Sequence, residues 1–205
     1  MLYYNTISTP TLELLKVLQE IPALKSTRLV GGTGLALQIG HRISVDIDLF
    51  ANNLKEDFIS IIAAIKQKGY IVDIRKQSSN IMVSMINGIK VDIVNYPYKW
   101  LYPPKYEEGI SLAAFNDIAA MKLSAVTNRG TKKDFIDLYY LLKVYSLKQM
   151  LSFYEEKYNA STFIVLKSLT YFEDAEIEIL PKMLDSTFDW TKLKNKIKKE
   201  VLKLS

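Results

Sequence analysis

The sequence contains no cysteine, which excludes disulfide bridges and metal sites built from thiolates. It also has no apolar run of about 18 residues, the length that a membrane-spanning helix needs. The first ten residues, MLYYNTISTP, lack the basic start and the apolar stretch of a secretory signal. We therefore expect a soluble, cytoplasmic protein that does not associate with membranes.

What the sequence does contain is ample apolar material, since 49% of the 205 residues are hydrophobic. A chain of this length suits one α/β core with a helical extension, or two small domains. The formal net charge of +5 favours polyanionic partners such as nucleotides or RNA. A solvated helix face is the simpler interpretation of the late lysines. These are Lys192, Lys194, Lys196, Lys198, Lys199 and Lys203.

Apolar periodicity divides the chain into a mixed first half and a helical second half. In the first half, helices are predicted at 11–19, 33–39 and 55–68, and strands at 28–30, 44–50, 70–75, 81–86 and 89–95. A proline-rich connector spans 96–104, and helices follow at 116–128, 133–145, 147–157, 161–169 and 190–204. The predicted fold class is α+β. A mixed-sheet core with flanking helices occupies residues 1–104, and a helical bundle occupies 105–205.

Two carboxylates, Asp46 and Asp48, alternate with apolar residues in the predicted strand 44–50. Side chains two apart on a strand share a face, and neighbouring carboxylates repel each other and raise each other's pKa. A divalent cation relieves this repulsion, because Mg²⁺ (or Mn²⁺) prefers oxygen ligands and is commonly held by carboxylates and substrate phosphates. Two such ions can stabilise the attacking and leaving oxygens of a phosphoryl displacement. The simpler alternative is a solvated sheet face.

A third carboxylate is expected on a neighbouring strand, and Asp92 is preferred over Asp73. Asp92 lies in Lys90-Val91-Asp92-Ile93-Val94, directly after the hairpin signal Asn87-Gly88. A buried aspartate without a partner is costly, and a shared metal site explains it. The predicted metal ligands are therefore Asp46, Asp48 and Asp92, and all three are candidate catalytic residues.

The pair Gly31-Gly32 is the candidate phosphate-binding element. Paired glycines let the backbone approach a phosphate closely and supply amide donors at the start of a helix. Thr33 can cap that helix or bind a phosphate oxygen, and Arg42 and Ser44 are further phosphate candidates. The stretch GGTGLALQ lacks the ending of a P-loop and the third glycine of a dinucleotide-binding motif. An ordinary turn is the alternative interpretation of the glycine pair.

These stretches resemble the AbiEii/AbiGii family of nucleotidyltransferase-like toxins, within the DNA polymerase β-like nucleotidyltransferase superfamily. The segment Leu29–Thr33 followed by Arg42–Phe50 resembles the family's first motif. Residues 116–129, with Lys122 and Arg129, and residues 132–139, with Asp134 and Asp137, resemble its later motifs. The resemblance spans residues 28–143 and implies a nucleotidyltransferase-type sheet core.

The resemblance implies a metal-dependent transfer of a nucleoside monophosphate from an NTP to an acceptor. In relatives the acceptor is the 3′ end of tRNA, and the outcome is a block of translation in a toxin–antitoxin or phage-defence setting. The implied partners are therefore an NTP, an RNA (tRNA) acceptor and a cognate antitoxin encoded nearby. Two alternatives stay open: transfer to a small molecule of the antibiotic type, and a non-catalytic module that binds NTP.

Lys122 and Arg129 are seven residues apart and so share one helix face, which suits a triphosphate lying along the helix. Asp134 and Asp137 share a face of the next predicted helix. Asp134 is placed with the substrate-binding residues, and Asp137 is predicted to orient Lys122 or a catalytic water, or to act as a base. Surface cations and a structural ion pair are the alternatives. The only histidine, His41, fits a loop better than a catalytic base.

Overall fold

The computed structural model describes residues 1–204 and divides into two compact units. The first unit comprises residues 1–40, 44–99 and 104–113, and the second comprises 41–43, 100–103 and the chain from 114 onward. The expected division after residue 104 lies just before a strand hairpin that belongs to the first unit. Within residues 1–204, no helix is both long and apolar enough to cross a membrane.

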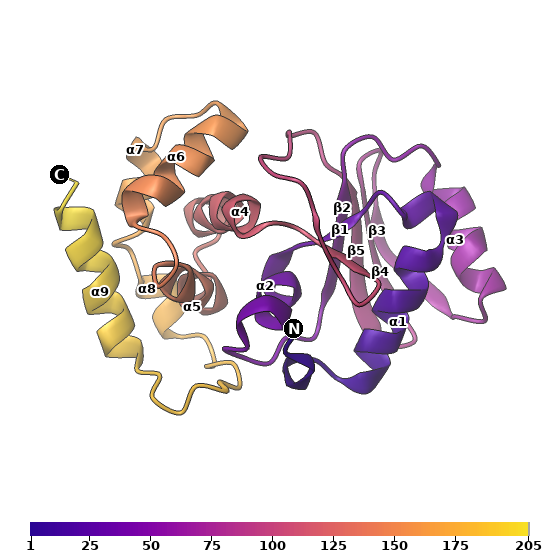
Figure 1. Ribbon diagram of the computed structural model, residues 1–205, viewed down its shortest axis with the longest axis horizontal. Helices are drawn as coiled ribbons and strands as arrows, with labels where there is room; N and C mark the ends of the chain where they lie inside the picture. The colour runs from indigo at the N-terminus through magenta and orange to yellow at the C-terminus, as the bar shows by residue number, and fades with distance from the viewer. Residues whose placement is uncertain (205) are drawn as a thin grey trace. The chain divides into compact units, whose positions relative to one another are not determined.

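The first unit is built on a seven-stranded mixed sheet in the order β3-β4-β5-β2-β1-β7-β6. Figure 1 labels strands β1 to β5 of this sheet. The strands are β1 (Arg28–Leu29), β2 (Ile47–Ala51), β3 (Val72–Gln77), β4 (Ile81–Ile86), β5 (Ile89–Asn95), β6 (Lys105–Glu107) and β7 (Ile110–Leu112). β2 lies at the centre, parallel to β5 and antiparallel to β1. The mixed sheet with its helices confirms the predicted α+β class.

Three α-helices complete the first unit: α1 (Thr9–Glu20), α2 (Gly31–Ile39) and α3 (Phe58–Gln67). Short 3-10 helices span Tyr4–Thr6 and Pro22–Leu24. α1 buries Leu14, Leu15 and Leu18 in a core that also contains Ile47 and Leu49 of β2. The residues of β2 that alternate with these apolar positions are therefore left on the other face of the sheet.

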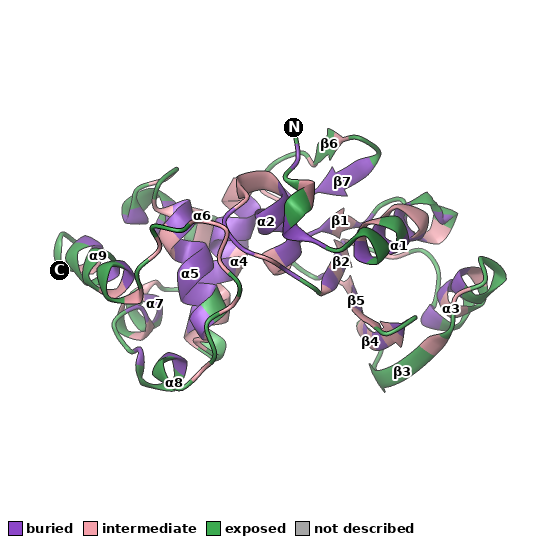
Figure 2. Cartoon of the chain, turned by 90° about the horizontal axis from the view of Figure 1, so that it is seen from below, coloured by how far each residue is buried: buried purple, intermediate pink, exposed green. Residues whose placement is uncertain are grey.

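The second unit is helical, with α4 (Phe115–Asn128), α5 (Lys132–Leu141), α6 (Leu147–Tyr158), α7 (Phe163–Ser168), α8 (Glu173–Glu176) and α9 (Trp190–Leu202). Figure 2 shows α5 as largely buried, whereas α9 keeps a long exposed face. Residues 100–103 join this unit because Asp117 of α4 accepts the amides of Leu101 and Tyr102 at 3.0 and 3.2 Å. Lys157 neutralises the same buried carboxylate at 2.7 Å.

Three local expectations need correction. The sequence prediction assigns almost everything beyond residue 104 to helices and includes no strand there, but β6 and β7 form a hairpin, and β7 pairs with β1. The expected strand 44–50 begins only at Ile47, so Asp46 precedes the strand and Val45 is 58% exposed. The glycine pair does not precede a helix, because Gly31 is already the first residue of α2.

Candidate active site

Asp48 on β2 and Asp92 on β5 occupy paired positions of two neighbouring parallel strands. Paired residues of adjacent strands point to the same face and are about 4.8 Å apart, so the two carboxylates lie side by side. Asp73 is on the edge strand β3, separated from β2 by β4 and β5, where its half-exposed carboxylate pairs with Arg75 at 2.9 Å. The sheet therefore brings Asp92 to Asp48 and keeps Asp73 away.

Lys90 links the three predicted carboxylates electrostatically. It lies two residues before Asp92 on β5, and its Nζ is 2.8 Å from Asp92 Oδ2. Burial lowers the pKa of Lys90, but the hydrogen bond to Asp92 and the charges of Asp92, Asp48 and Asp46 outweigh this effect and raise it. All three carboxylates thus act on one ammonium group, although Asp46 lies outside the strand.

The oxygen atoms of Asp92 fit a divalent cation. Asp92 Oδ1 is buried without a hydrogen-bond partner, which is costly for a carboxylate and is relieved by a bound cation. Carboxylate oxygens are also the ligands that Mg²⁺ and Mn²⁺ prefer. Over residues 1–204, no three acidic or histidine side chains are already gathered as a ligand set. Lys90 contacts Asp92 Oδ2, so the oxygen that can accept a cation without breaking this contact is Oδ1.

Gly31 is fitted to Asp48 both by its backbone and by its missing side chain. Its φ is +66°, and a Cβ at this position would lie 2.1 Å from Asp48 Oδ2. The carboxylate of Asp48 therefore lies against the first residue of α2. Val30, which precedes α2, makes no side-chain hydrogen bond to the amides of the first turn. Such amides attract phosphates and other anions.

Thr33 and Ser44 support the loop that carries Asp46. The Thr33 hydroxyl lies 2.9 Å from Ser44 Oγ and also contacts the carbonyl oxygen of Asp46. The amide of Ser44 donates to the carbonyl of Thr6 at 2.8 Å. Both hydroxyl side chains are buried, so the contacts that the structure gives them hold the protein's own backbone. Phosphate binding by Gly32, Thr33 and Ser44 stays a prediction.

Replacing Gly31 with alanine is expected to lower the rate of nucleotidyl transfer by about 10²-fold, because the new methyl group displaces the Asp48 carboxylate. The measurement is the initial rate with labelled NTP. Gly109→Ala is the matched control, since Gly109 also has a positive φ (+81°) but no atom lies within 4 Å of its added Cβ. Equal rates for the two variants would contradict the proposed contact.

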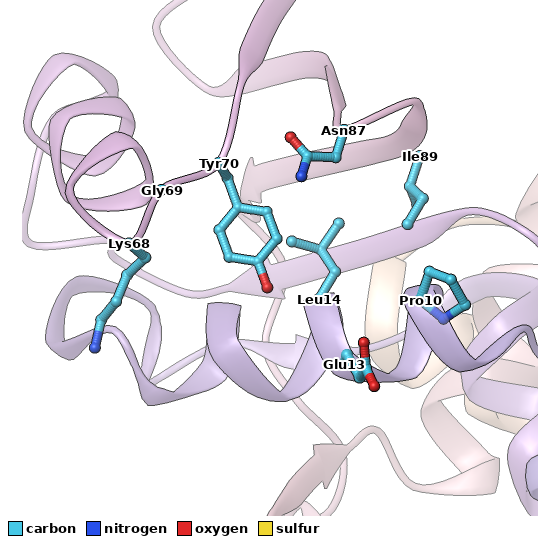
Figure 3. Close-up of a pocket in the computed structure, with 8 residues that line it drawn as sticks. All are labelled: Pro10, Glu13, Leu14, Lys68, Gly69, Tyr70, Asn87 and Ile89. Carbon is cyan, nitrogen blue, oxygen red and sulfur yellow. The ribbon is translucent and has the colours of Figure 1, made fainter.

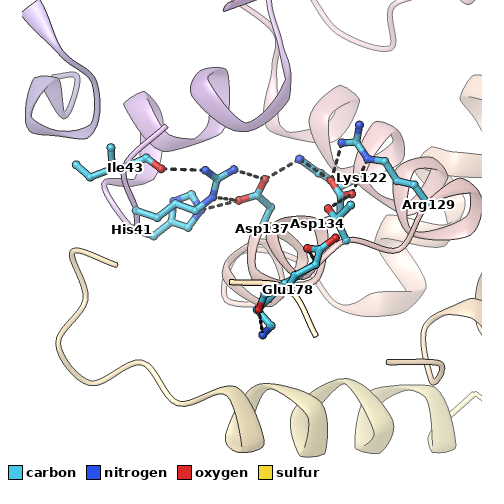
Figure 4. Close-up of polar contacts among 10 residues, drawn as sticks. His41, Ile43, Lys122, Arg129, Asp134, Asp137 and Glu178 are labelled. Carbon is cyan, nitrogen blue, oxygen red and sulfur yellow. Dashed lines mark hydrogen bonds and ion pairs between the residues drawn. The ribbon is translucent and has the colours of Figure 1, made fainter. Parts of the chain in front are cut away.

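The remaining candidates form a buried ion-pair network in the second unit (Figure 4). Asp137 on α5 accepts a hydrogen bond from Arg42 Nε at 2.8 Å and another from a second guanidinium nitrogen at 2.9 Å. It also contacts His41 Nε2 at 2.8 Å and Lys122 Nζ at 2.6 Å. Arg42, expected at a phosphate, is only 3% exposed and is committed to Asp137 through this pair of hydrogen bonds.

Asp134 forms the other half of the network. It accepts a hydrogen bond from Lys122 Nζ at 3.0 Å and one from the Thr131 hydroxyl at 2.6 Å. Two nitrogens of Arg129 also donate to it, at 2.8 and 3.0 Å. Lys122 therefore bridges Asp134 and Asp137 from α4 and is itself buried. The Arg129 side chain is 63% exposed and forms the solvent end of the chain of contacts. Contact of Lys122, Arg129 or Asp134 with a nucleotide stays a prediction.

The charges of the network determine what its aspartates can do. Burial alone would raise the pKa of Asp137, but Lys122 and Arg42 lower it well below its usual range. For Asp134, burial is likewise outweighed by Lys122 and Arg129, which lower its pKa to about 2. A carboxylate held this strongly in its ionised form is a poor proton acceptor. Of the roles predicted for Asp137, the contact with Lys122 supports orientation rather than general-base catalysis.

Sequence reasoning missed the partners of these residues more than the residues themselves. His41 lies outside the helices and strands, as expected, but its side chain is buried, and burial lowers its pKa in spite of the neighbouring Asp137. The pairing of His41 with a residue 96 positions away has no local signal. Lys90 was also missed, although its spacing of two from Asp92 on a strand places both side chains on one face.

A separate cavity of about 330 Å³ in the first unit contains none of the predicted residues (Figure 3). It is lined by α1, the turn after α3 and the hairpin between β4 and β5, and its lining includes Glu13, Lys68, Tyr70 and Asn87. In that hairpin, Asn87 and Gly88 have φ values of 46° and 81°, which agree with the predicted type I′ turn. The cavity adds no acidic cluster to the candidate site.

Comparison with known proteins gives three findings. The family model "Nucleotidyl transferase AbiEii toxin, Type IV TA system" matches residues 13–201. An uncharacterized protein of Aquifex aeolicus (strain VF5) is 38% identical over 157 residues, covering 74% of this chain and 76% of the relative.

Two solved structures share the fold. JHP933 from Helicobacter pylori has a TM-score of 0.61 at 18% identity, covering 97% of this chain and 93% of its own. The antibiotic-resistance factor ANT(2'')-Ia has a TM-score of 0.52 at 13% identity, and the match covers 71% of this chain and 90% of that protein.

Proposed function

Because the chain belongs to the AbiEii family of nucleotidyltransferase toxins, we propose that it transfers a nucleoside monophosphate from an NTP to RNA, with the 3′ end of tRNA as the preferred acceptor. The family establishes the class of reaction, and its description as a type IV toxin–antitoxin family supports a toxin role. The choice of acceptor, the metal ion and a role in phage defence are our proposals.

The observation that carries the proposal is the pairing of Asp48 with Asp92 across β2 and β5, with one oxygen of Asp92 left without a partner. In this proposal Asp46, Asp48 and Asp92 hold Mg²⁺ or Mn²⁺. When bound, the cation neutralises charge on the transferred phosphate and on the attacking hydroxyl. The amides of Gly31 and Gly32, at the start of α2, are suited to a phosphate of the NTP.

The second unit contributes fixed positive charge in this proposal. Asp134 and Asp137 hold Lys122 in place at 3.0 and 2.6 Å. Asp134 holds Arg129 in a defined orientation, and the exposed side chain of Arg129 adds positive charge for an anionic ligand. Asp137 is thus a positioning residue, and its effect on transfer is exerted through Lys122 and Arg42.

The test is a transfer assay with each of the four labelled NTPs, offered in parallel to total tRNA and to aminoglycosides in the presence of Mg²⁺. We expect label in tRNA, at its 3′ end, and its loss with Asp92→Asn but not with Asp73→Asn. Label in the aminoglycosides alone would replace RNA by a small-molecule acceptor, the alternative favoured by the shared fold of ANT(2'')-Ia. Absence of label in both arms, with tight nucleotide binding, would favour a non-catalytic module.

The toxin assignment has its own test in living cells. Expression of the wild-type chain is expected to arrest growth, and co-expression of the gene beside it is expected to restore growth if it encodes the antitoxin. Asp46→Ala and Lys122→Ala should not arrest growth. Arrest by both variants would contradict a toxic effect through nucleotidyl transfer.

A further inference from the structure

The positive charge of this protein is concentrated in one helix. Residues 190–203, which comprise α9 and Lys203, contain six lysines and one glutamate and therefore carry a formal charge of +5. The whole chain also has a formal charge of +5, so the remaining residues are neutral in sum. A polyanion that meets this protein therefore finds its strongest attraction at α9.

Four of these lysines form a straight stripe along the helix. Lys192, Lys196, Lys199 and Lys203 follow one another at spacings of four, three and four residues, which places them on one side of a helix. All four are exposed. With a rise of 1.5 Å per residue, the stripe is about 16 Å long. A flanking side of α9 is used for packing, because Leu193 and Ile197 are buried.

The lysine stripe is distinct from the lysines that stabilise the unit. Lys194 pairs with Glu176, and Lys198 lies 5.8 Å from the ring centroid of Phe172. Within the stripe, Lys196 and Lys203 share Glu200 at 2.9 and 2.8 Å. Among the described residues, Lys192 and Lys199 have no carboxylate partner. The stripe therefore presents more positive charge than the protein itself neutralises.

We propose that the lysine stripe of α9 binds the phosphate backbone of the RNA acceptor; this inference rests on the proposed function. Lysine ammonium groups act as point charges for phosphates, and four of them over about 16 Å can follow several successive phosphates of one strand. The stripe contains no aromatic or amide side chain, so it contributes affinity and no base readout. A membrane-surface role is disfavoured, because the apolar side of α9 is already packed.

The test is RNA binding measured by fluorescence anisotropy, with a 5′-labelled RNA hairpin that has a single-stranded 3′ end. EDTA is present so that no transfer occurs. The variant replaces Lys192, Lys196, Lys199 and Lys203 with glutamine, which retains helix propensity. The matched control replaces four exposed lysines of the first unit, Lys25, Lys66, Lys68 and Lys76, and has the same net charge. Circular dichroism and thermal unfolding check that both fold.

For the stripe variant we expect RNA binding to be roughly tenfold weaker at moderate salt. The slope of log K against log salt should be smaller in magnitude by about 3, because each of the four lost phosphate contacts contributes about 0.7–0.9 to that slope. The control should retain the wild-type slope. In the transfer assay the stripe variant should show a raised KM for RNA and an unchanged kcat. An unchanged slope would overturn the inference, as would an equal loss in both variants.

Two further outcomes separate this inference from the proposed function. Wild-type transfer to RNA together with stripe-independent binding would overturn the inference and leave the function intact. Stripe-dependent RNA binding without transfer from any NTP would overturn the function and support the binding surface alone.

The membrane alternative has its own outcome. If the stripe bound phosphatidylserine vesicles and its substitution had no effect on RNA binding, the stripe would be assigned to a membrane surface and the inference would be overturned.

Discussion

Asp48→Asn is expected to lower kcat for nucleotidyl transfer by about 10²–10³-fold, a range typical of losing one preorganised electrostatic group. Asparagine keeps the shape of the side chain against Gly31 but removes the negative charge that lies beside Asp92. Stability should not fall, because the substitution relieves the repulsion between the paired carboxylates of Asp48 and Asp92. A large loss of activity without a loss of stability is therefore the expected signature of a cation site.

The control for this experiment is Asp73→Asn, which removes the same charge from the edge strand of the same sheet. It is expected to retain wild-type kcat and KM. Initial rates at saturating NTP and RNA give kcat, and thermal unfolding gives the stability of each variant. If Asp48→Asn kept more than a tenth of the wild-type rate, Asp48 would not be a metal-binding catalytic carboxylate.

Asp137→Asn is expected to give the largest loss of stability, about 3–5 kcal/mol, which is typical when one partner of a buried ion pair is removed. The substitution leaves Arg42 and Lys122, both buried, with only Asp134 as a negative partner in the network. For a chain of this size, each kcal/mol corresponds to a Tm shift of about 2–4 °C, so Tm should fall by about 10 °C.

Thermal unfolding monitored by circular dichroism measures this effect. Asp73→Asn is again the comparison, because it breaks an ion pair with Arg75 whose two side chains are 55% and 61% exposed. An exposed pair of this kind contributes about 0–1 kcal/mol. Equal Tm shifts for the two variants would show that the buried network does not stabilise the fold. Wild-type transfer kinetics for Asp137→Asn would contradict its role as a positioning residue.

The elements that could be predicted from the sequence are those with strong local signals. β4 and β5 have the predicted bounds because Asn87-Gly88 fixes the turn between them and β-branched residues fill both strands. The pairing of Asp48 with Asp92 could be anticipated for the same reason, since periodicity places each carboxylate on a strand. β6 and β7 are only three residues long, which is too short for a periodic pattern.

Non-local contacts account for most of what could not be predicted. Residues 41–43 belong to the second unit because Arg42 bridges to Met183, and Leu184 donates to the carbonyl of His41 at 2.9 Å. No local pattern identifies a partner more than 100 residues away. The roles of Thr33 and Ser44 were inferred from their chemistry alone, and the same hydroxyl groups suit a phosphate or the protein backbone equally well.

Metal binding at the paired carboxylates can be measured directly by titrating the protein with Mn²⁺ and recording the electron paramagnetic resonance signal of the free ion, which falls as Mn²⁺ binds. The wild-type protein is expected to bind Mn²⁺, and Asp92→Asn is expected to weaken this binding at least tenfold whereas Asp73→Asn does not. Unchanged Mn²⁺ affinity in Asp92→Asn would contradict the claim that the paired carboxylates of β2 and β5 form the metal site.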